Sequence, residues 1–232
     1  MASLPLFPLG TVLMPGAQLP LQIFEPRYVR MLRDLVDAQD ERPPVFGVIA
    51  IREGFEVGSD GVRALHPIGC AARLTQAAAI ATDRFLVVCR GTDRFTLEGI
   101  EPAGTDYFTA SVSYLDESDG DTDAVPALAD RLRREVAAYR RSTASAMSSA
   151  VSPDGEQGEP GEVAEPPDDG RELSYWLPEA VNLDLAERQR LLACPDTAAR
   201  LRLALGIVRR ERALADTLGA FAPPPDRPFS LN

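Results

Sequence analysis

The chain has 232 residues, 45% of them hydrophobic, which is enough for a sizeable buried core in one or two domains. Asp and Glu number 35 against 24 basic residues, the formal charge is -11, and every basic residue is arginine because lysine is absent. The absence of lysine excludes Schiff-base chemistry, the phosphate-binding lysine of a P-loop and a Ser-Lys dyad. His66 is the single histidine, so multi-histidine metal sites are excluded too.

The three cysteines, Cys70, Cys89 and Cys194, are widely spaced and form no C-x-x-C pair. This pattern favours buried thiols in a reducing compartment over a disulfide framework. The opening residues lack a basic leader region, and no apolar run approaches the roughly 20 residues that span a bilayer. We therefore expect a soluble cytoplasmic protein with no membrane partner.

The negative charge is concentrated in residues 116–123 and 142–171, which together account for the whole net charge. The rest of the chain is balanced, which argues against a basic nucleic-acid-binding surface. Residues 142–171 are acidic, rich in Pro, Gly and Ser, and free of aromatic residues, a composition that predicts disorder.

Up to about residue 115 the sequence predicts short strands bounded by turn residues. These apolar, β-branched or aromatic segments are residues 19–24, 45–51, 68–75, 85–91, 95–100 and 109–115. One helix interrupts them, because Pro26 suits a first helical position and apolar residues then recur at helical spacing from Tyr28 to Val36. This succession predicts a small barrel or sandwich.

After about residue 124 the hydrophobic period becomes helical. Helices are predicted over residues 127–141, 173–181 and 185–193, and a long helix follows for which Asp196 is the expected N-cap. Strands first and helices afterwards define an α+β class.

The residues that identify a family lie mainly at the start of the chain, in segments 4–16 and 19–28, LPLFPLGTVLMPG and LPLQIFEPRY. They closely resemble the opening of Lon N-terminal domains, and stand-alone bacterial members in particular. Segments 68–74 and 90–95 resemble that domain's internal strands, and segment 186–192 resembles its helical subdomain.

This resemblance implies a PUA-like β-barrel with one inserted helix, followed by a C-terminal helical bundle, a domain that Lon uses to engage substrate proteins. We expect the following division: a barrel subdomain over 1–123, a connecting helix over 124–141, the disordered insert over 142–171, a helical subdomain over 172–222 and a tail over 223–232. The insert departs from the family pattern. We expect no enzymatic activity, because lysine is absent and the sequence ends at Asn232 without the ATPase and protease domains.

We interpret the opening motif as a fold-forming element rather than as a partner contact. Its prolines stiffen a strand-turn-strand entry, and a carboxylate at a helix start favours the helix dipole. The residues that form this motif are Pro5, Pro8, Gly10, Pro15, Gly16, Phe24, Glu25, Arg27 and Tyr28.

Three arrangements imitate functional sites without satisfying their requirements. His66 and Cys70 lie four residues apart along a predicted strand, too far for a thiol-base pair. Residues 119–123 resemble the start of a calcium loop but lack its glycine and its glutamate, so we interpret them as a solvated acidic loop. The arginines of residues 200–212 lie opposite an apolar stripe, as in any amphipathic helix. We predict no metal, cofactor or catalytic site.

Three aromatic residues are candidate partner contacts: Phe55 in an expected turn, and Tyr175 and Trp176 after the insert. Core packing is the alternative fate of Trp176. We interpret the chain as a non-catalytic module that binds polypeptide partners, including unfolded segments, through apolar side chains and main-chain pairing at a barrel edge. The alternative is a PUA-like protein that binds nucleic acid or a small molecule.

Overall fold

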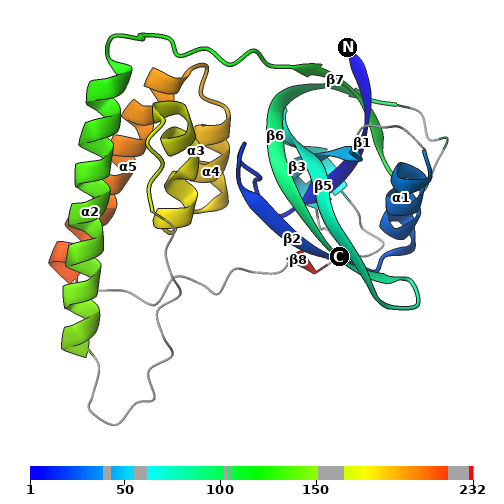
Figure 1. Cartoon of the computed structure of the whole chain (residues 1–232), viewed down its shortest axis with the longest axis horizontal. Coiled ribbons are helices and arrows are strands. Elements are labelled where there is room, and N and C mark those ends of the chain that lie inside the picture. Colours follow the sequence, from blue (N-terminus) through cyan, green and yellow to red (C-terminus); the bar gives the residue numbers. More distant parts are fainter. Residues whose placement is uncertain are drawn as a thin grey trace. The chain divides into compact units, whose positions relative to one another are not determined.

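The computed structural model describes residues 1–38, 43–54, 62–101, 104, 106–150, 165–218 and 230–231. Its contacts divide the chain into two compact units. The first unit comprises Met1–Asp116, Leu185–Ala193 and Pro228–Asn232, and the second comprises Glu117–Asp184 and Cys194–Arg227. Strands dominate the first unit and helices the second, which confirms the predicted α+β class (Figure 1).

The first unit contains a small closed barrel. Its strands are β1 (Ala2–Leu9), β2 (Gln18–Ile23), β3 (Val45–Gly54), β4 (Val62–Leu65), β5 (Ile68–Ala81), β6 (Arg84–Ile100), β7 (Thr109–Tyr114) and β8 (Ser230–Leu231). Pairing runs from β3 through β1, β7, β6 and β5 back to β3, so these five strands close on themselves. Only the β1–β3 pair within this circuit is parallel.

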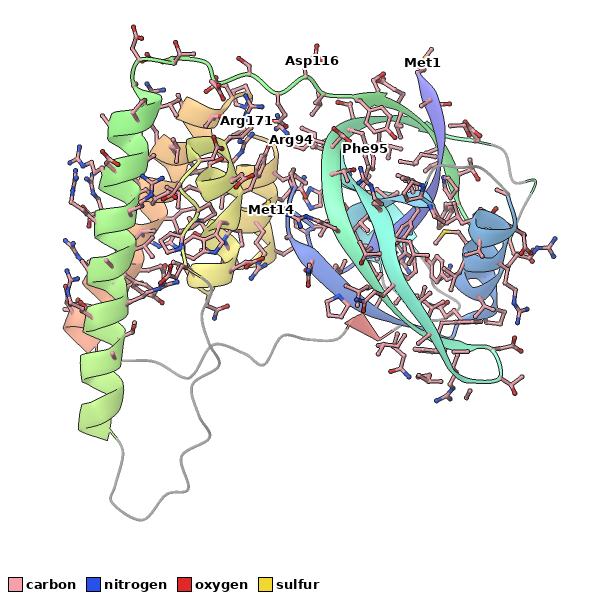
Figure 2. All side chains as sticks on the ribbon, in the orientation of Figure 1. Met1, Met14, Arg94, Phe95, Asp116 and Arg171 are labelled. Atoms are coloured by element: carbon pink, nitrogen blue, oxygen red, sulfur yellow. The ribbon has the colours of Figure 1, made fainter. Side chains whose placement is uncertain are left out.

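The barrel core is filled by inward-facing residues of several strands. Leu4 and Leu6 of β1 pack with Ile49 of β3, Val112 of β7 and Phe95 of β6, which is labelled in Figure 2. Such burial supplies the main driving force for closing the barrel, at roughly 1.5–3 kcal/mol for each buried apolar side chain.

Helix α1 (Pro26–Asp37) begins where the sequence predicts it, with Pro26 in its first turn. Tyr28 is fully buried, and its ring contacts that of Phe7 edge to face with centroids 4.2 Å apart. The opening strand and the first helix are therefore joined by an aromatic pair.

Strand β6 is a single strand of 17 residues, whereas the sequence predicted two strands, over 85–91 and 95–100. The strand continues through Gly91, whose backbone forms two hydrogen bonds with the turn around Pro15 and Gly16. Gly91 N–H donates to Ala17 O, and Gly16 N–H donates to Gly91 O, both at 2.9 Å. A side chain at Gly91 would place its Cβ 2.1 Å from Met14 O, so only glycine permits this approach.

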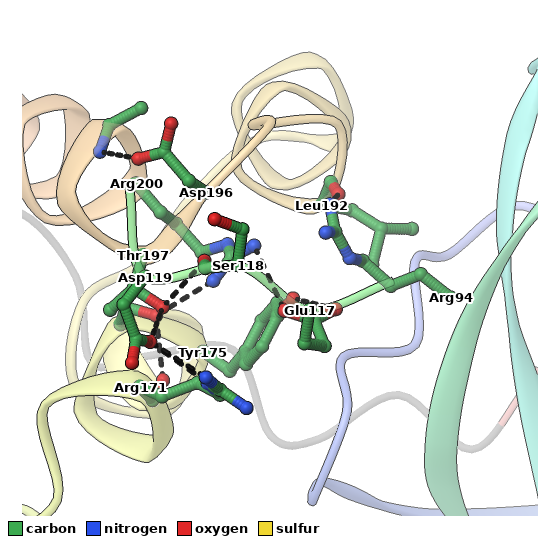
Figure 3. Close-up of polar contacts among 12 residues, drawn as sticks. Arg94, Glu117, Ser118, Asp119, Arg171, Tyr175, Leu192, Asp196, Thr197 and Arg200 are labelled. Carbon is green, nitrogen blue, oxygen red and sulfur yellow. Dashed lines mark hydrogen bonds and ion pairs between the residues drawn. The ribbon is translucent and has the colours of Figure 1, made fainter. Parts of the chain in front are cut away.

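Helix α4 (Leu185–Leu192) belongs to the barrel unit, although the sequence placed it in a helical subdomain over 172–222. The fully buried Arg94 of β6 donates from Nη1 to Leu192 O at 2.8 Å (Figure 3). Gln189 donates from Nε2 to Ile68 O of β5 at 2.9 Å. Helix α4 is assigned to the barrel unit because of these long-range hydrogen bonds, which helical periodicity in the sequence does not reveal.

The second unit is built from α2 (Val125–Ala150), α3 (Gly170–Ala180) and α5 (Thr197–Leu218). Asp196 Oδ1 accepts the N–H of Ala199 at 2.7 Å, as its predicted capping role requires. The prediction of disorder over 142–171 is wrong at both ends, because α2 continues to Ala150 and α3 starts at Gly170. Residues 151–164 lie outside the described part of the chain.

Residues 117–119 tie the helices of the second unit together (Figure 3). Asp119 Oδ1 accepts hydrogen bonds from Arg171 Nη2 at 2.8 Å and from Thr197 Oγ1 at 2.9 Å. Ser118 O accepts the N–H of Thr197 at 2.9 Å. The prediction of a solvated acidic loop over 119–123 did not include this role of Asp119, whose side chain is 39% exposed and connects the starts of α3 and α5.

A second carboxylate of this segment, Glu117, lies beside a buried cation. Arg200 of α5 is fully buried; its Cζ lies 3.7 Å from the ring centroid of Tyr175, and its Nη2 lies 3.7 Å from Glu117 Oε2. Tyr175 donates from its hydroxyl to Glu117 Oε1 at 2.8 Å. The carboxylate and the ring together compensate the burial of the Arg200 charge.

These contacts predict acid sensitivity at Asp119. Hydrogen bonds from Arg171 and Thr197 lower the pKa of this carboxyl below its ordinary value of 3.8. A lowered pKa in the folded state stabilises the protein above pH 3.8, and this stabilisation disappears as the pH falls through the ordinary pKa toward the folded one.

Asp119→Asn should reduce the free energy of unfolding at pH 6 by on the order of 1 kcal/mol or less, and the difference from the wild type should shrink by pH 3. Urea unfolding at both pH values measures this change. The matched control is Asp123→Asn, which removes the same charge from an exposed position of the same segment. An equal pH dependence of the two variants would contradict the prediction.

Candidate functional site

An exposed three-stranded ribbon projects from the barrel, formed by β2, residues 74–81 of β5 and residues 84–90 of β6 (Figure 1). Along β6, Val88 lies opposite Pro20 of β2 and opposite Gln76 of β5. Leu86 in turn lies opposite Gln22 and Ala78. Directly opposed residues point to the same face of a sheet, so these side chains share one face of the ribbon.

This face is uncharged and open to solvent, with Gln22 and Gln76 among its apolar residues, whereas the other face is buried on β2 and β6 but exposed at Ala77 and Ala79 of β5. Leu86 is 38% exposed, and Ile80, the extra residue at a register shift between Ala79 and Ala81, is 53% exposed. Leu21 and Val87, which alternate with the residues of this face, are fully buried. We call the apolar residues of the open face, together with the neighbouring exposed Ile80, the outer patch: Pro20, Ala78, Ile80, Leu86 and Val88.

The outer patch contains no charge, and charged residues lie at its two ends. Residues 74–82 read LTQAAAIAT, an uncharged run in a chain of which a quarter of residues are charged. Arg73 and Arg90 oppose each other at one end, and Asp83 occupies the hairpin turn at the other with φ of 55°. Arg33 of α1 forms an ion pair with Asp83 at 2.5 Å, which anchors the turn.

One edge of the ribbon is open. Strand β3 pairs with β5 only over residues 70–73, and Leu74 N–H then donates to Pro44 O. From residue 75 to 81, no strand in the described ranges pairs with the outer edge of β5. The ribbon thus combines exposed apolar side chains with a strand edge, the two features through which proteins take up extended peptides.

Two of the three candidate contact residues predicted from sequence lie outside the ribbon. Tyr175 and Trp176 are only 5% and 8% exposed, and Arg140 Cζ lies 5.2 Å from the centroid of the Trp176 ring. Both residues belong to the core of the second unit, which corrects their assignment as partner anchors. Phe55 lies outside the described residues.

The opening motif occupies structural positions, consistent with its interpretation as a fold-forming element. Pro8 and Tyr28 are buried, and Gly16 adopts φ of 83° in the turn that binds β6. Glu25 and Arg27 form an ion pair at 2.9 Å at the start of α1. The remaining motif residues are at most half-buried and belong to β1, to its turns or to the approach to α1: Pro5, Gly10, Pro15 and Phe24.

The residues that resemble a thiol-base pair, a metal site or a nucleic-acid-binding surface in the sequence do not form such sites in the described part of the structure. Burial raises the pKa of Cys70, while burial and then the charge of Arg52 lower that of His66, so this pair has neither a ready thiolate nor a strong base. No cluster of His, Cys, Asp and Glu among the described residues could hold a metal ion. On α5, Arg209 and Arg212 both bind the carboxylate of Glu135, at 3.1 and 2.6 Å.

The family of the chain follows from comparison with known proteins. Residues 3–210 match the model of the ATP-dependent protease La (LON) substrate-binding domain. Because this match covers most of the chain, the protein belongs to that family. Across the described segments, none of the helices has the length and hydropathy required to cross a membrane.

Curated relatives are full Lon proteases matched over part of their length. The chain is 28% identical over 220 residues to Lon protease 2 of Sorangium cellulosum, covering 90% of this chain and 25% of that protein. It is 25% identical over 219 residues to Lon protease of Anaeromyxobacter dehalogenans, covering 92% and 24%. The chain thus spans about a quarter of the length of these relatives.

Solved structures share the fold. A Lon N-terminal domain protein from Xanthomonas campestris superposes with a TM-score of 0.61 at 24% identity, covering 89% of this chain and 98% of that one. The N-terminal domain of a Mycobacterium avium complex Lon protease gives 0.59 at 19% identity, covering 90% and 98%. These similarities confirm the predicted architecture.

Thiol reactivity tests whether the outer patch is exposed. Cys70 and Cys89 are buried, and burial raises the pKa of Cys89 to about 12, so both should react with a thiol reagent at pH 8 only on unfolding. Ala78→Cys should introduce one rapidly reacting thiol in the folded protein. The rate of labelling with a colorimetric disulfide reagent measures this difference, and slow labelling at position 78 would show that the patch is covered.

The fold-forming interpretation of the motif predicts a large effect at Tyr28. Tyr28→Ala should lower the free energy of unfolding by roughly 3–5 kcal/mol, since it removes a buried ring and leaves a cavity beside Phe7. Arg30→Ala, on the exposed side of the same helix, should change it by about 0.5 kcal/mol or less. Urea denaturation compares the two, and similar values for both would contradict the interpretation.

Proposed function

We propose that this chain is a non-catalytic polypeptide-binding module that captures extended apolar segments of unfolded proteins on the outer patch. The observation that carries the proposal is an uncharged sheet face with exposed apolar side chains beside an open strand edge of β5. Membership of a substrate-binding family supports the same class of partner.

The chemistry of the outer patch suits an unfolded partner better than a folded one. Folded proteins bury most of their apolar side chains and pair their backbone groups internally, whereas an unfolded segment offers both. Each apolar side chain buried against Leu86 and Ile80 contributes roughly 1.5–3 kcal/mol, from which the entropy of association is subtracted. We therefore expect weak, reversible binding, with Kd on the order of 1–100 µM.

The alternative functions, nucleic-acid binding and catalysis, are supported by fewer residues of this chain. Arg202 of α5 forms an ion pair with Asp121 at 3.1 Å, and Arg209 and Arg212 share Glu135, so the arginines of this helix are largely neutralised by intramolecular carboxylates. Such pairing opposes a nucleic-acid groove, which requires uncompensated positive charge. The lack of lysine excludes a Ser-Lys dyad and a P-loop in this chain. The buried, widely spaced cysteines favour a cytoplasmic location.

Fluorescence anisotropy tests the proposal. One small labelled protein is presented in its folded form and in a form kept unfolded by reduction and alkylation of its disulfides. Saturable binding of the unfolded form alone is the expected result. Equal binding of both forms, or binding of neither, would contradict the proposed function.

Variants locate the binding surface. Replacing Ile80 and Leu86 together by Ser should weaken binding of the unfolded protein by about fivefold or more, because both exposed side chains lose apolar contact area. The matched control is Ile100→Ser, which removes a similarly exposed side chain (46%) from β6 outside the outer patch. If the control weakens binding as much as the double variant, the surface is assigned wrongly.

A further inference from the structure

The edge of β2 that faces away from β6 is already occupied by another part of the chain. Residues Ser230–Leu231 form β8 and pair with β2 in parallel, with Ser230 opposite Leu21 and Leu231 opposite Gln22 (Figure 1). The same Gln22 lies opposite Leu86 of the outer patch across the ribbon. The occupied edge therefore adjoins the surface proposed to bind polypeptide.

The pairing of β8 is short and distant in sequence. Two residues supply few ladder hydrogen bonds, each with a net contribution of only about 0.5–1.5 kcal/mol. Closing a loop of nearly the whole chain opposes the pairing with conformational entropy, although this cost grows slowly with loop length. Such a strand is readily displaced by a competitor that adds side-chain contacts.

The sequence around β8 has the chemistry of the proposed partner. Residues 228–232 read PFSLN, with two large apolar residues and no charged side chain. An extended segment of this composition alternates its side chains across the two faces of a sheet. Residues 228–232 therefore have the same composition as the uncharged apolar segments that we propose bind the outer patch.

We infer that the edge of β2 that faces away from β6 is a strand-addition site that takes an extended, uncharged polypeptide segment parallel to β2, and that residues 230–231 occupy this site in cis. The inference rests on the proposed function and specifies how the partner is held. Backbone hydrogen bonds to β2 orient the segment, while its alternate side chains reach the neighbouring outer patch. An incoming segment must displace β8, which lowers the apparent affinity of the intact chain.

The test removes the cis occupant in two independent ways. One variant ends after Arg227, and the other, Ser230→Pro with Leu231→Pro, keeps the length and charge but removes two backbone donors. Deletion of Asn232 alone is the matched control. In the anisotropy assay, both test variants should bind the labelled unfolded protein at least about threefold more tightly, and the control should bind like the intact chain. Unchanged or weaker binding by both test variants overturns the inference.

A second measurement separates this inference from the proposed function. A labelled synthetic peptide with the sequence of residues 225–232, PDRPFSLN, should bind the variant that ends after Arg227, whereas a scrambled peptide should not. If no chain binds the unfolded protein but this peptide binds, the proposed function fails and the strand-addition site stands. If the unfolded protein binds and the peptide does not, the inference about β2 fails alone.

Discussion

The architecture of the first unit depends on the pairing of one long strand, β6. Its first half pairs with β2 and β5 in the exposed ribbon, and its second half closes the barrel with β5 and β7. Gly91 stands between the two halves and leaves room for the Pro15–Gly16 turn to approach the backbone. The barrel and the exposed ribbon therefore share one continuous backbone, which places the outer patch next to a well-packed core.

Charge is distributed so that the outer patch remains neutral. Several arginines of the second unit bind carboxylates of the same unit, including Arg171 with Asp119 and Arg212 with Glu135. Arg33 and Asp83 neutralise each other at the tip of the β5–β6 hairpin. A neutral apolar face has no preference for the charge of a partner, and sheet-edge hydrogen bonds involve backbone groups common to all residues. Under the proposed function, selectivity then depends on whether a segment is extended and accessible.

Local sequence signals determined several features of the protein. The change of hydrophobic period near residue 124 indicated an α+β class, Pro26 marked the start of α1, and Asp196 was identified as a helix cap. The opening motif by itself indicates the family. These signals are reliable because helix caps, proline geometry and hydrophobic periodicity act between residues that are close along the chain.

The tertiary structure decided what depends on distant partners. Strand β5 continues beyond its predicted end at residue 75 because β6 pairs with its alanine-rich run, and strand register alone brings Pro20 beside Val88. Nothing local distinguishes an aromatic residue on a surface from Tyr175, which is buried because Arg200 and Glu117 contact it from remote segments. Sheet register and the burial of polar groups are set by long-range pairing, so only the folded structure reveals this surface.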